Sequence, residues 1–124
     1  MTGALTIAEA AEHTGITAHT LRYYERIGLM APISRAHSGH RRYSSDDLRW
    51  LELLKRLQAS GMPIRRMREF ARLHRRGDGT IPQRRAVLDA HREDVESSIA
   101  ELKKTLALIK KKIALYDADE RAAA

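Results

Sequence analysis

The sequence predicts a mainly α-helical fold, in which a winged helix-turn-helix is followed by one long coiled-coil helix. Three observations lead to it. Capping residues and glycines divide residues 6–76 into short helices. A polar segment over residues 29–43 interrupts them and has the composition of a small hairpin. The positions of a 4-3 repeat from Leu88 to Tyr116 are then all apolar except Arg92.

Length and composition exclude several classes of protein. With 124 residues, the chain has room for one small domain and at most one extension. It contains no cysteine, which excludes disulfides, thiolate metal sites and iron–sulfur clusters. Neither a signal-peptide pattern nor an apolar run near the roughly 20 residues that span a bilayer is present, so we expect a cytoplasmic protein without membrane contact.

Charge is distributed unevenly along the chain. Residues 1–76 hold 14 Lys or Arg and 7 Asp or Glu, whereas residues 77–124 hold 9 of each kind. The whole excess of positive charge therefore lies in the first part, as expected for a module that binds a polyanion. A basic surface without any partner is the alternative that charge alone leaves open.

The first two helices are expected to form a helix-turn-helix over residues 6–28. Thr6 and Glu9 make a capping-box pattern for a helix that ends near Gly15, and Thr17 caps the second helix. In such a pair the second helix is the recognition helix, which enters the major groove of DNA.

This second helix has two different faces. Leu21 and Tyr24 lie on one face and can be buried. Arginine donates to guanine edges and phosphates, and an aromatic ring packs on sugars and thymine methyls, so a stripe of such groups predicts binding to double-stranded DNA. The stripe on the other face consists of His19, Arg22, Tyr23 and Arg26.

Residues 29–43 predict a small β-hairpin, a wing, with its tip near His37–His40. Arg35 precedes the turn, and Arg41 and Arg42 follow it. A hairpin this short has no hydrophobic core in which these side chains could pack. Contacts with phosphates or the minor groove explain them better than packing does.

Two further helices complete the first domain, which we place at residues 1–76. Ser44 begins a capping pattern for a helix at residues 44–60, and Pro63 suits the first turn of another at residues 63–76. The apolar residues of both segments follow the helical period and predict a common core.

Neither a metal site nor a catalytic site is indicated. His37 and His40 lie on a hairpin tip, and His13 and His74 have no cysteine or acidic companion at ligand spacing. The sequence also shows no Ser/His/Asp arrangement, no paired carboxylates and no Gly-rich phosphate loop. We therefore expect no cofactor and no enzymatic activity.

Residues 80–117 predict one long helix, with a short tail at residues 118–124. From Pro82 to Tyr116 this helix would measure about 52 Å, and a chain this short has nothing to cover its second half. We therefore expect a homodimer. Besides Arg92, the seam that would join the two copies consists of Leu88, Val95, Ile99, Leu102, Leu106, Ile109, Ile113 and Tyr116.

Charges beside the seam favour an antiparallel pair. The e positions are acidic at Asp89 and Glu96 and basic at Lys103 and Lys110. In antiparallel helices e faces e′, so each acidic residue meets a basic one, whereas a parallel pair gains little. An exposed pair contributes only about 0.2–1 kcal/mol, so the charges select the orientation while the seam supplies stability.

Four segments stand out by their order and spacing. They are residues 21–29 (LRYYERIGL), residues 39–43 (GHRRY), Asp47-Leu48 and Gly61-Met62. Together they resemble the MerR family of bacterial transcription regulators, and the resemblance covers essentially the whole chain. It implies a dimer that bends and untwists a palindromic promoter, a costly deformation that brings two promoter elements into register for RNA polymerase.

The resemblance also implies which side chains contact DNA. Arg26 and Arg42 lie on the same surfaces, and we include them in the predicted contact set. The matching positions are Thr17, His19, Arg22, Tyr23 and Tyr24 in the recognition helix, and Arg35, His40, Arg41 and Tyr43 in the wing.

The terminal helix is similar to that of the family branch that responds to aldehydes and related electrophiles. That branch senses through one cysteine in the third helix, and Arg56 occupies the matching position here. Sensing through a thiol is thereby excluded. The effector, the operator and the direction of regulation are not specified by the sequence.

A sequence-specific dimeric regulator explains both the recognition-helix stripe and the heptad pattern. A general DNA-coating or architectural protein would share the basic charge but would need neither the stripe nor a fixed dimer spacing. A small-molecule pocket between the helix bundle and the end of the coiled coil is also left open.

Overall fold

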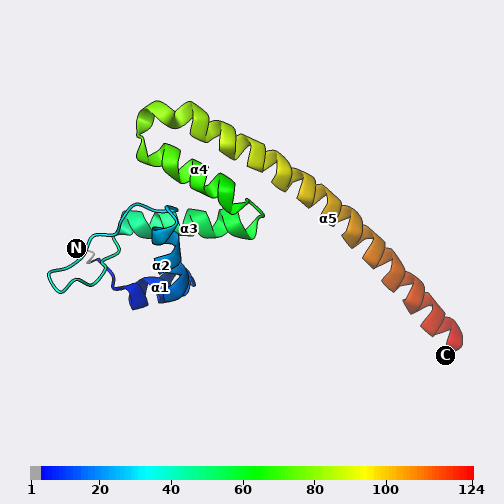
Figure 1. Ribbon diagram of the computed structural model, residues 1–124. Helices are drawn as coiled ribbons and strands as arrows, with labels where there is room; N and C mark the ends of the chain where they lie inside the picture. Colours follow the sequence, from blue (N-terminus) through cyan, green and yellow to red (C-terminus); the bar gives the residue numbers. More distant parts are fainter. Residues whose placement is uncertain (1–3) are drawn as a thin grey trace. The chain divides into compact units, whose positions relative to one another are not determined.

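The structure, a computed structural model, describes residues 4–124 as helices joined by short loops (Figure 1). It divides into a first unit that ends at Leu88 and a second that begins at Asp89. The mainly α-helical class predicted from the sequence is confirmed, and no helix in this part of the chain is long and apolar enough to span a membrane. The elements are α1 (Ile7–Thr14), α2 (Ala18–Arg26), α3 (Ser45–Ala59), α4 (Ile64–Arg75), the 3₁₀ turn η1 (Asp78–Thr80) and α5 (Ile81–Ala123).

Side chains cap the helices where the sequence predicts it. The Glu9 N–H donates to Thr6 Oγ1 at 3.2 Å, and the Thr6 N–H donates to a Glu9 carboxylate oxygen at 2.8 Å. Gly15 then ends α1 with φ 74°, a left-handed conformation that suits glycine. Ser44 caps α3 in the same reciprocal way, and Pro63 is the N-cap of α4 rather than part of its first turn.

Helix α3 is the centre of the first unit, because it packs against both α1 and α4 while α1 also contacts α2. The core is built mainly from leucine and methionine, in keeping with the few aromatic residues of the chain. It holds one face of α2 firmly and leaves the other face exposed. The largest fully buried side chains are Leu21, Leu29, Tyr43, Leu51, Leu54 and Met67.

A short hairpin connects α2 to α3. Arg35 and Arg41 pair across it, supported by a 2.8 Å hydrogen bond from the Arg42 N–H to the Ser34 carbonyl oxygen. At the base, Leu5 and Tyr43 exchange two backbone hydrogen bonds of 2.8 Å each, a pairing that the sequence did not reveal. Leu5, two residues before α1, is thereby fastened to the returning arm of the hairpin.

The first unit extends past the predicted boundary at residue 76 and includes the first turns of α5. Val87 lies in the core with 6% of its surface exposed. The Thr80 hydroxyl is 2.6 Å from the Leu73 carbonyl oxygen, to which it donates, and it accepts a 3.1 Å hydrogen bond from Arg84 Nε. Thr80 therefore satisfies a free carbonyl group near the end of α4.

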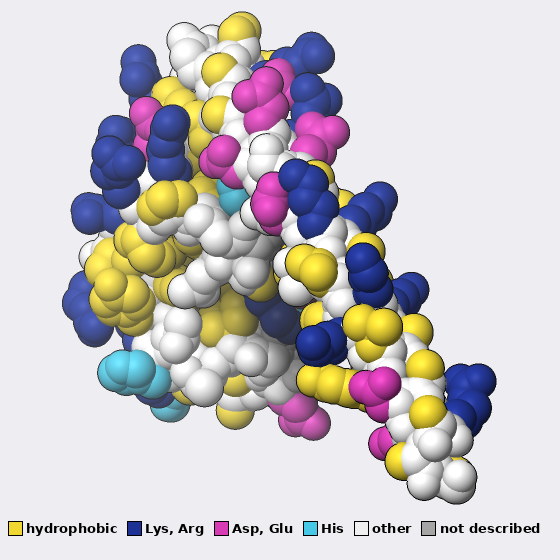
Figure 2. All heavy atoms as spheres, turned by 90° about the vertical axis from the view of Figure 1, so that its right-hand side faces the viewer, with side chains coloured by type: hydrophobic (Ala, Val, Ile, Leu, Met, Phe, Trp, Pro, Cys, Tyr) yellow, Lys and Arg dark blue, Asp and Glu magenta, His cyan; other side chains and the backbone are white. Residues whose placement is uncertain are grey.

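In the second unit, α5 runs as a single helix to Ala123. The segment at residues 118–124, which we predicted to be a tail outside the helix, is therefore helical up to Ala123. Alanine and charged residues with good helix propensity explain the extension. Its apolar side chains are exposed, among them Ile99 at 47%, Leu102 at 67% and Leu106 at 49%. Figure 2 shows hydrophobic side chains along this helix, interspersed with charged ones.

Candidate nucleic-acid interface

The exposed face of α2 carries cationic and aromatic side chains. His19, Arg22 and Arg26 are exposed, and Tyr23 is 38% exposed. The Arg26 guanidinium lies 5.5 Å from the centre of the Tyr23 ring, a cation–π contact that gives this stripe a defined shape. The stripe predicted from the helical spacing is thus present as one surface.

The opposite face of α2 anchors the helix in the core. Leu21 is fully buried and Tyr24 is 2% exposed. The Tyr24 hydroxyl donates to the Gln58 side-chain oxygen at 2.5 Å, and burial raises the pKa of this phenol. The expectation that Tyr24 contacts DNA is therefore corrected, because its ring packs inside the first unit and its hydroxyl is already bonded to α3.

Thr17 begins α2 and has an exposed side chain. Its hydroxyl oxygen accepts the Thr20 N–H at 3.1 Å, which satisfies one of the free N–H groups at the start of the helix. Thr17 therefore fixes where α2 begins, and as an exposed residue it remains a candidate for a phosphate contact.

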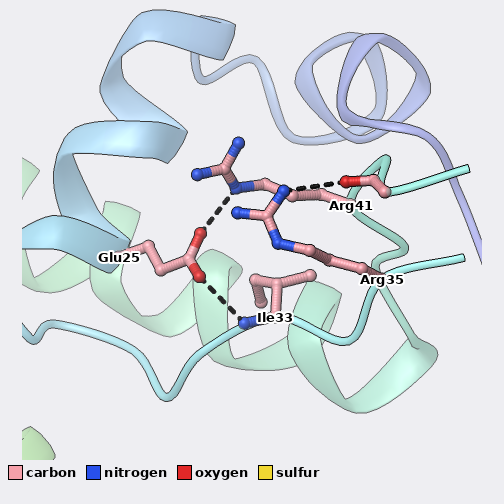
Figure 3. Close-up of polar contacts among 5 residues, drawn as sticks. Glu25, Ile33, Arg35 and Arg41 are labelled. Atoms are coloured by element: carbon pink, nitrogen blue, oxygen red, sulfur yellow. Dashed lines mark hydrogen bonds and ion pairs between the residues drawn. The ribbon is translucent and has the colours of Figure 1, made fainter.

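Glu25 joins α2 to the wing (Figure 3). One carboxylate oxygen accepts Arg41 Nε at 2.6 Å, and the other accepts the Ile33 N–H at 3.1 Å. Burial alone would raise the pKa of Glu25, but these hydrogen bonds and the charges of Arg41 and Arg35 outweigh it and lower the pKa. Glu25 is therefore ionised at neutral pH.

The wing places its predicted residues in different environments. Arg35, His40 and Arg42 are exposed, and Arg35 Nη1 donates to the Gly39 carbonyl oxygen at 2.9 Å. Arg41 is half-buried beside Glu25. Tyr43 has no exposed surface and its pKa is raised by burial, so the expectation of a DNA contact at Tyr43 is also corrected.

A hollow of about 410 Å³ lies between α2 and the wing, lined by Arg22, Glu25, Arg26, Pro32 and Arg41. Three guanidinium groups face one carboxylate there. The hollow is thus net positive and offers planar, multivalent donors, which suit phosphate oxygens and base edges. We call it the α2–wing hollow.

Sequence reasoning missed Glu25 as a residue of this surface. Its position in the sequence could have indicated a role, because Glu25 lies beside the cationic stripe of the recognition helix. A carboxylate there repels DNA phosphates unless another group of the protein pairs with it. Within residues 4–124 no group of three or more His, Asp or Glu side chains is placed to hold a metal ion.

Comparisons with known proteins identify the family. A family model described as MerR HTH family regulatory protein matches residues 5–73, and one described as MerR, DNA binding matches residues 48–112. An HTH-type transcriptional regulator of Haemophilus influenzae is 40% identical over 111 residues, which cover 90% of this chain and 82% of the relative. The regulator AdhR of Bacillus subtilis is 39% identical over 72% of this chain and 64% of its own length.

Solved structures agree. HiNmlR, a MerR family regulator that lacks the sensor domain and was crystallised bound to promoter DNA, is 37% identical with a TM-score of 0.88, covering 98% of this chain and 96% of that one. A MerR family regulator from Listeria monocytogenes is 36% identical with a TM-score of 0.87, and the match covers 92% of this chain and 86% of that one. These relatives are transcription regulators and not enzymes. The chain therefore belongs to the MerR family of helix-turn-helix transcriptional regulators.

Proposed function

We propose that two copies of this chain bind one palindromic promoter and deform it to alter transcription initiation. The observation that carries the proposal is the exposed stripe of α2, held rigid by a buried back and placed beside a net-positive hollow. Members of this family bind promoter DNA as dimers, and the DNA-bound relative matches nearly the whole chain. RNA polymerase at the same promoter is the expected partner, and the cytoplasm the expected location.

The exposed apolar seam of α5 supports the dimer. Covering a leucine or isoleucine side chain contributes about 1.5–3 kcal/mol, so several such residues provide enough driving force to pair two chains. The second copy would also set a fixed distance between two α2 helices, as two half-sites in successive major grooves require. The charge pattern of the e positions favours antiparallel pairing.

The orientation can be tested by disulfide formation, because the native chain has no cysteine. In the antiparallel pair Asp89 faces Lys110 of the other copy, while the two copies of residue 89 lie about 32 Å apart along the axis. We expect Asp89→Cys and Lys110→Cys chains to cross-link when mixed, but neither to cross-link alone. Ready formation of a dimer linked through residue 89 in both copies would contradict antiparallel pairing.

Promoter binding can be tested by nuclease protection of genomic fragments with excess bulk DNA as competitor. We expect protection of a defined two-fold symmetric sequence that survives the competitor, and neighbouring genes would then indicate the signal. An architectural protein shares the basic charge of the first unit but would lose its protection evenly as competitor is added, which would refute the proposal.

A further inference from the structure

Glu25 has both carboxylate oxygens engaged between the recognition helix and the wing (Figure 3). Arg41 Nε, 2.6 Å away, comes from the returning arm of the wing, and the Ile33 N–H, 3.1 Å away, comes from the entering arm. The Glu25 and Arg41 side chains are only 15% and 23% exposed, so salt screens this pair less than a surface pair. One carboxylate thus fixes both arms of the wing relative to α2.

The same carboxylate lies where its charge is unfavourable for DNA affinity. It lines the α2–wing hollow together with Arg22, Arg26 and Arg41, and it offsets one of their three positive charges. Affinity that does not depend on sequence comes mainly from neutralising phosphates with cations. A residue selected only for affinity would not be acidic at this position.

We propose that Glu25 is a positioning residue that determines specificity: it orients Arg41 and the wing against α2 and restrains binding to DNA of the wrong sequence. This inference rests on the proposed function. With its Nε held by Glu25, Arg41 presents its remaining guanidinium donors in one direction. Only a duplex whose groove geometry fits α2 and the fixed wing together makes both sets of contacts.

The test compares the full chain with Glu25→Gln on two duplexes of equal length, the protected promoter sequence and a random sequence. The variant should bind random DNA more tightly, with a salt slope steeper by about 0.9, the value for one added phosphate contact. Promoter binding gains the same charge effect but loses wing orientation. The promoter-to-random affinity ratio should fall about tenfold or more, the scale of one charge-assisted hydrogen bond.

Two controls separate this role from a change in net charge. Glu52→Gln removes an exposed glutamate that pairs with Arg56 Nε at 3.3 Å on α3, and it should keep the wild-type ratio. In an Arg41→Gln background, Glu25→Gln should change the ratio little, because the contact that orients Arg41 is already absent and the amide oxygen of the new side chain can still accept the Ile33 N–H.

Tighter binding to random DNA cannot result from misfolding, which weakens binding to both duplexes. A wild-type ratio in Glu25→Gln, or an equal loss on both duplexes, would overturn the inference. If the wild-type chain itself did not prefer the promoter, the proposed function would fail instead, so the two failures are distinguishable.

Discussion

The two units of this chain use apolar residues in opposite ways. In the first unit Leu21, Leu51 and Leu54 have no exposed surface, whereas in the second Leu102 and Leu106 are 67% and 49% exposed. The first unit therefore has a core of its own. The second has the apolar pattern of half a core, and its stability must come from another copy of the chain.

The ion pairs of the two units also differ in burial and in the separation of their partners along the chain. The Arg41–Glu25 pair is half-buried and joins segments 16 residues apart. Along α5 the pairs are local and exposed, as between Lys104 and Glu101 at 3.2 Å. Such exposed pairs contribute roughly 0–1 kcal/mol each, so they keep the helix soluble but cannot replace a partner.

The largest effect should come from charges placed in the seam. We expect Ile99→Asp combined with Leu106→Asp to yield a monomer in sedimentation and to weaken promoter binding about 100-fold or more, since one module must then bind without the other. Thermal unfolding of the first unit should remain unchanged. Ser97→Asp adds one negative charge on the opposite side of α5 and should remain dimeric. A double variant that remained dimeric would refute the assignment of Ile99 and Leu106 to the dimer seam.

A cavity in the core of the first unit should lower the stability of that unit and leave the pairing of the two chains intact. Leu54→Ala removes a fully buried side chain at the centre of α3 and should cost about 2–5 kcal/mol of the free energy of unfolding. Denaturation followed by tryptophan fluorescence would measure this loss, because Trp50 lies on the same helix. Chain pairing through α5 should persist at temperatures where the first unit has already unfolded. Simultaneous loss of pairing and folding would show that the units are one cooperative body.

A smaller effect should appear in acid. The pKa of Glu25 is lower in the folded chain than in the unfolded one, so its contribution to stability is complete above the unfolded value, about 4.3. That contribution is lost as the pH falls from there toward the folded value. As the pH falls below about 4.3, the melting temperature of the wild-type chain should fall more steeply than that of Glu25→Gln. Parallel curves would mean that the carboxylate is not held as described.

Local signals predicted most of the helices, because caps and periodicity are encoded within a few residues. Thr6 with Glu9 and Ser44 with Asp47 form the capping contacts that their spacing predicts. The burial of Tyr43 was not predictable in this way, because it depends on a strand-like pairing with Leu5, 38 positions earlier.

In the candidate site, too, features set by neighbouring residues were predictable, whereas features set by residues far apart in the sequence were not. The stripe of α2 follows from helical spacing alone, and His19, Arg22 and Arg26 are exposed as expected. The role of Glu25 required knowledge of where the wing returns, since its partner Arg41 lies 16 residues away. Burial of Tyr24 was foreseen by the pattern of α2, although family resemblance had also suggested a contact with DNA.

The central claim is that the exposed face of α2 reads the DNA sequence. Arg22→Ala and Arg42→Ala, each compared with the wild-type chain on promoter and random duplexes, test it most directly. Arg22→Ala should weaken promoter binding by about 1–3 kcal/mol and random binding much less, whereas Arg42→Ala should weaken both alike because we expect Arg42 to contact phosphates. Equal losses on both duplexes for Arg22→Ala would contradict the account.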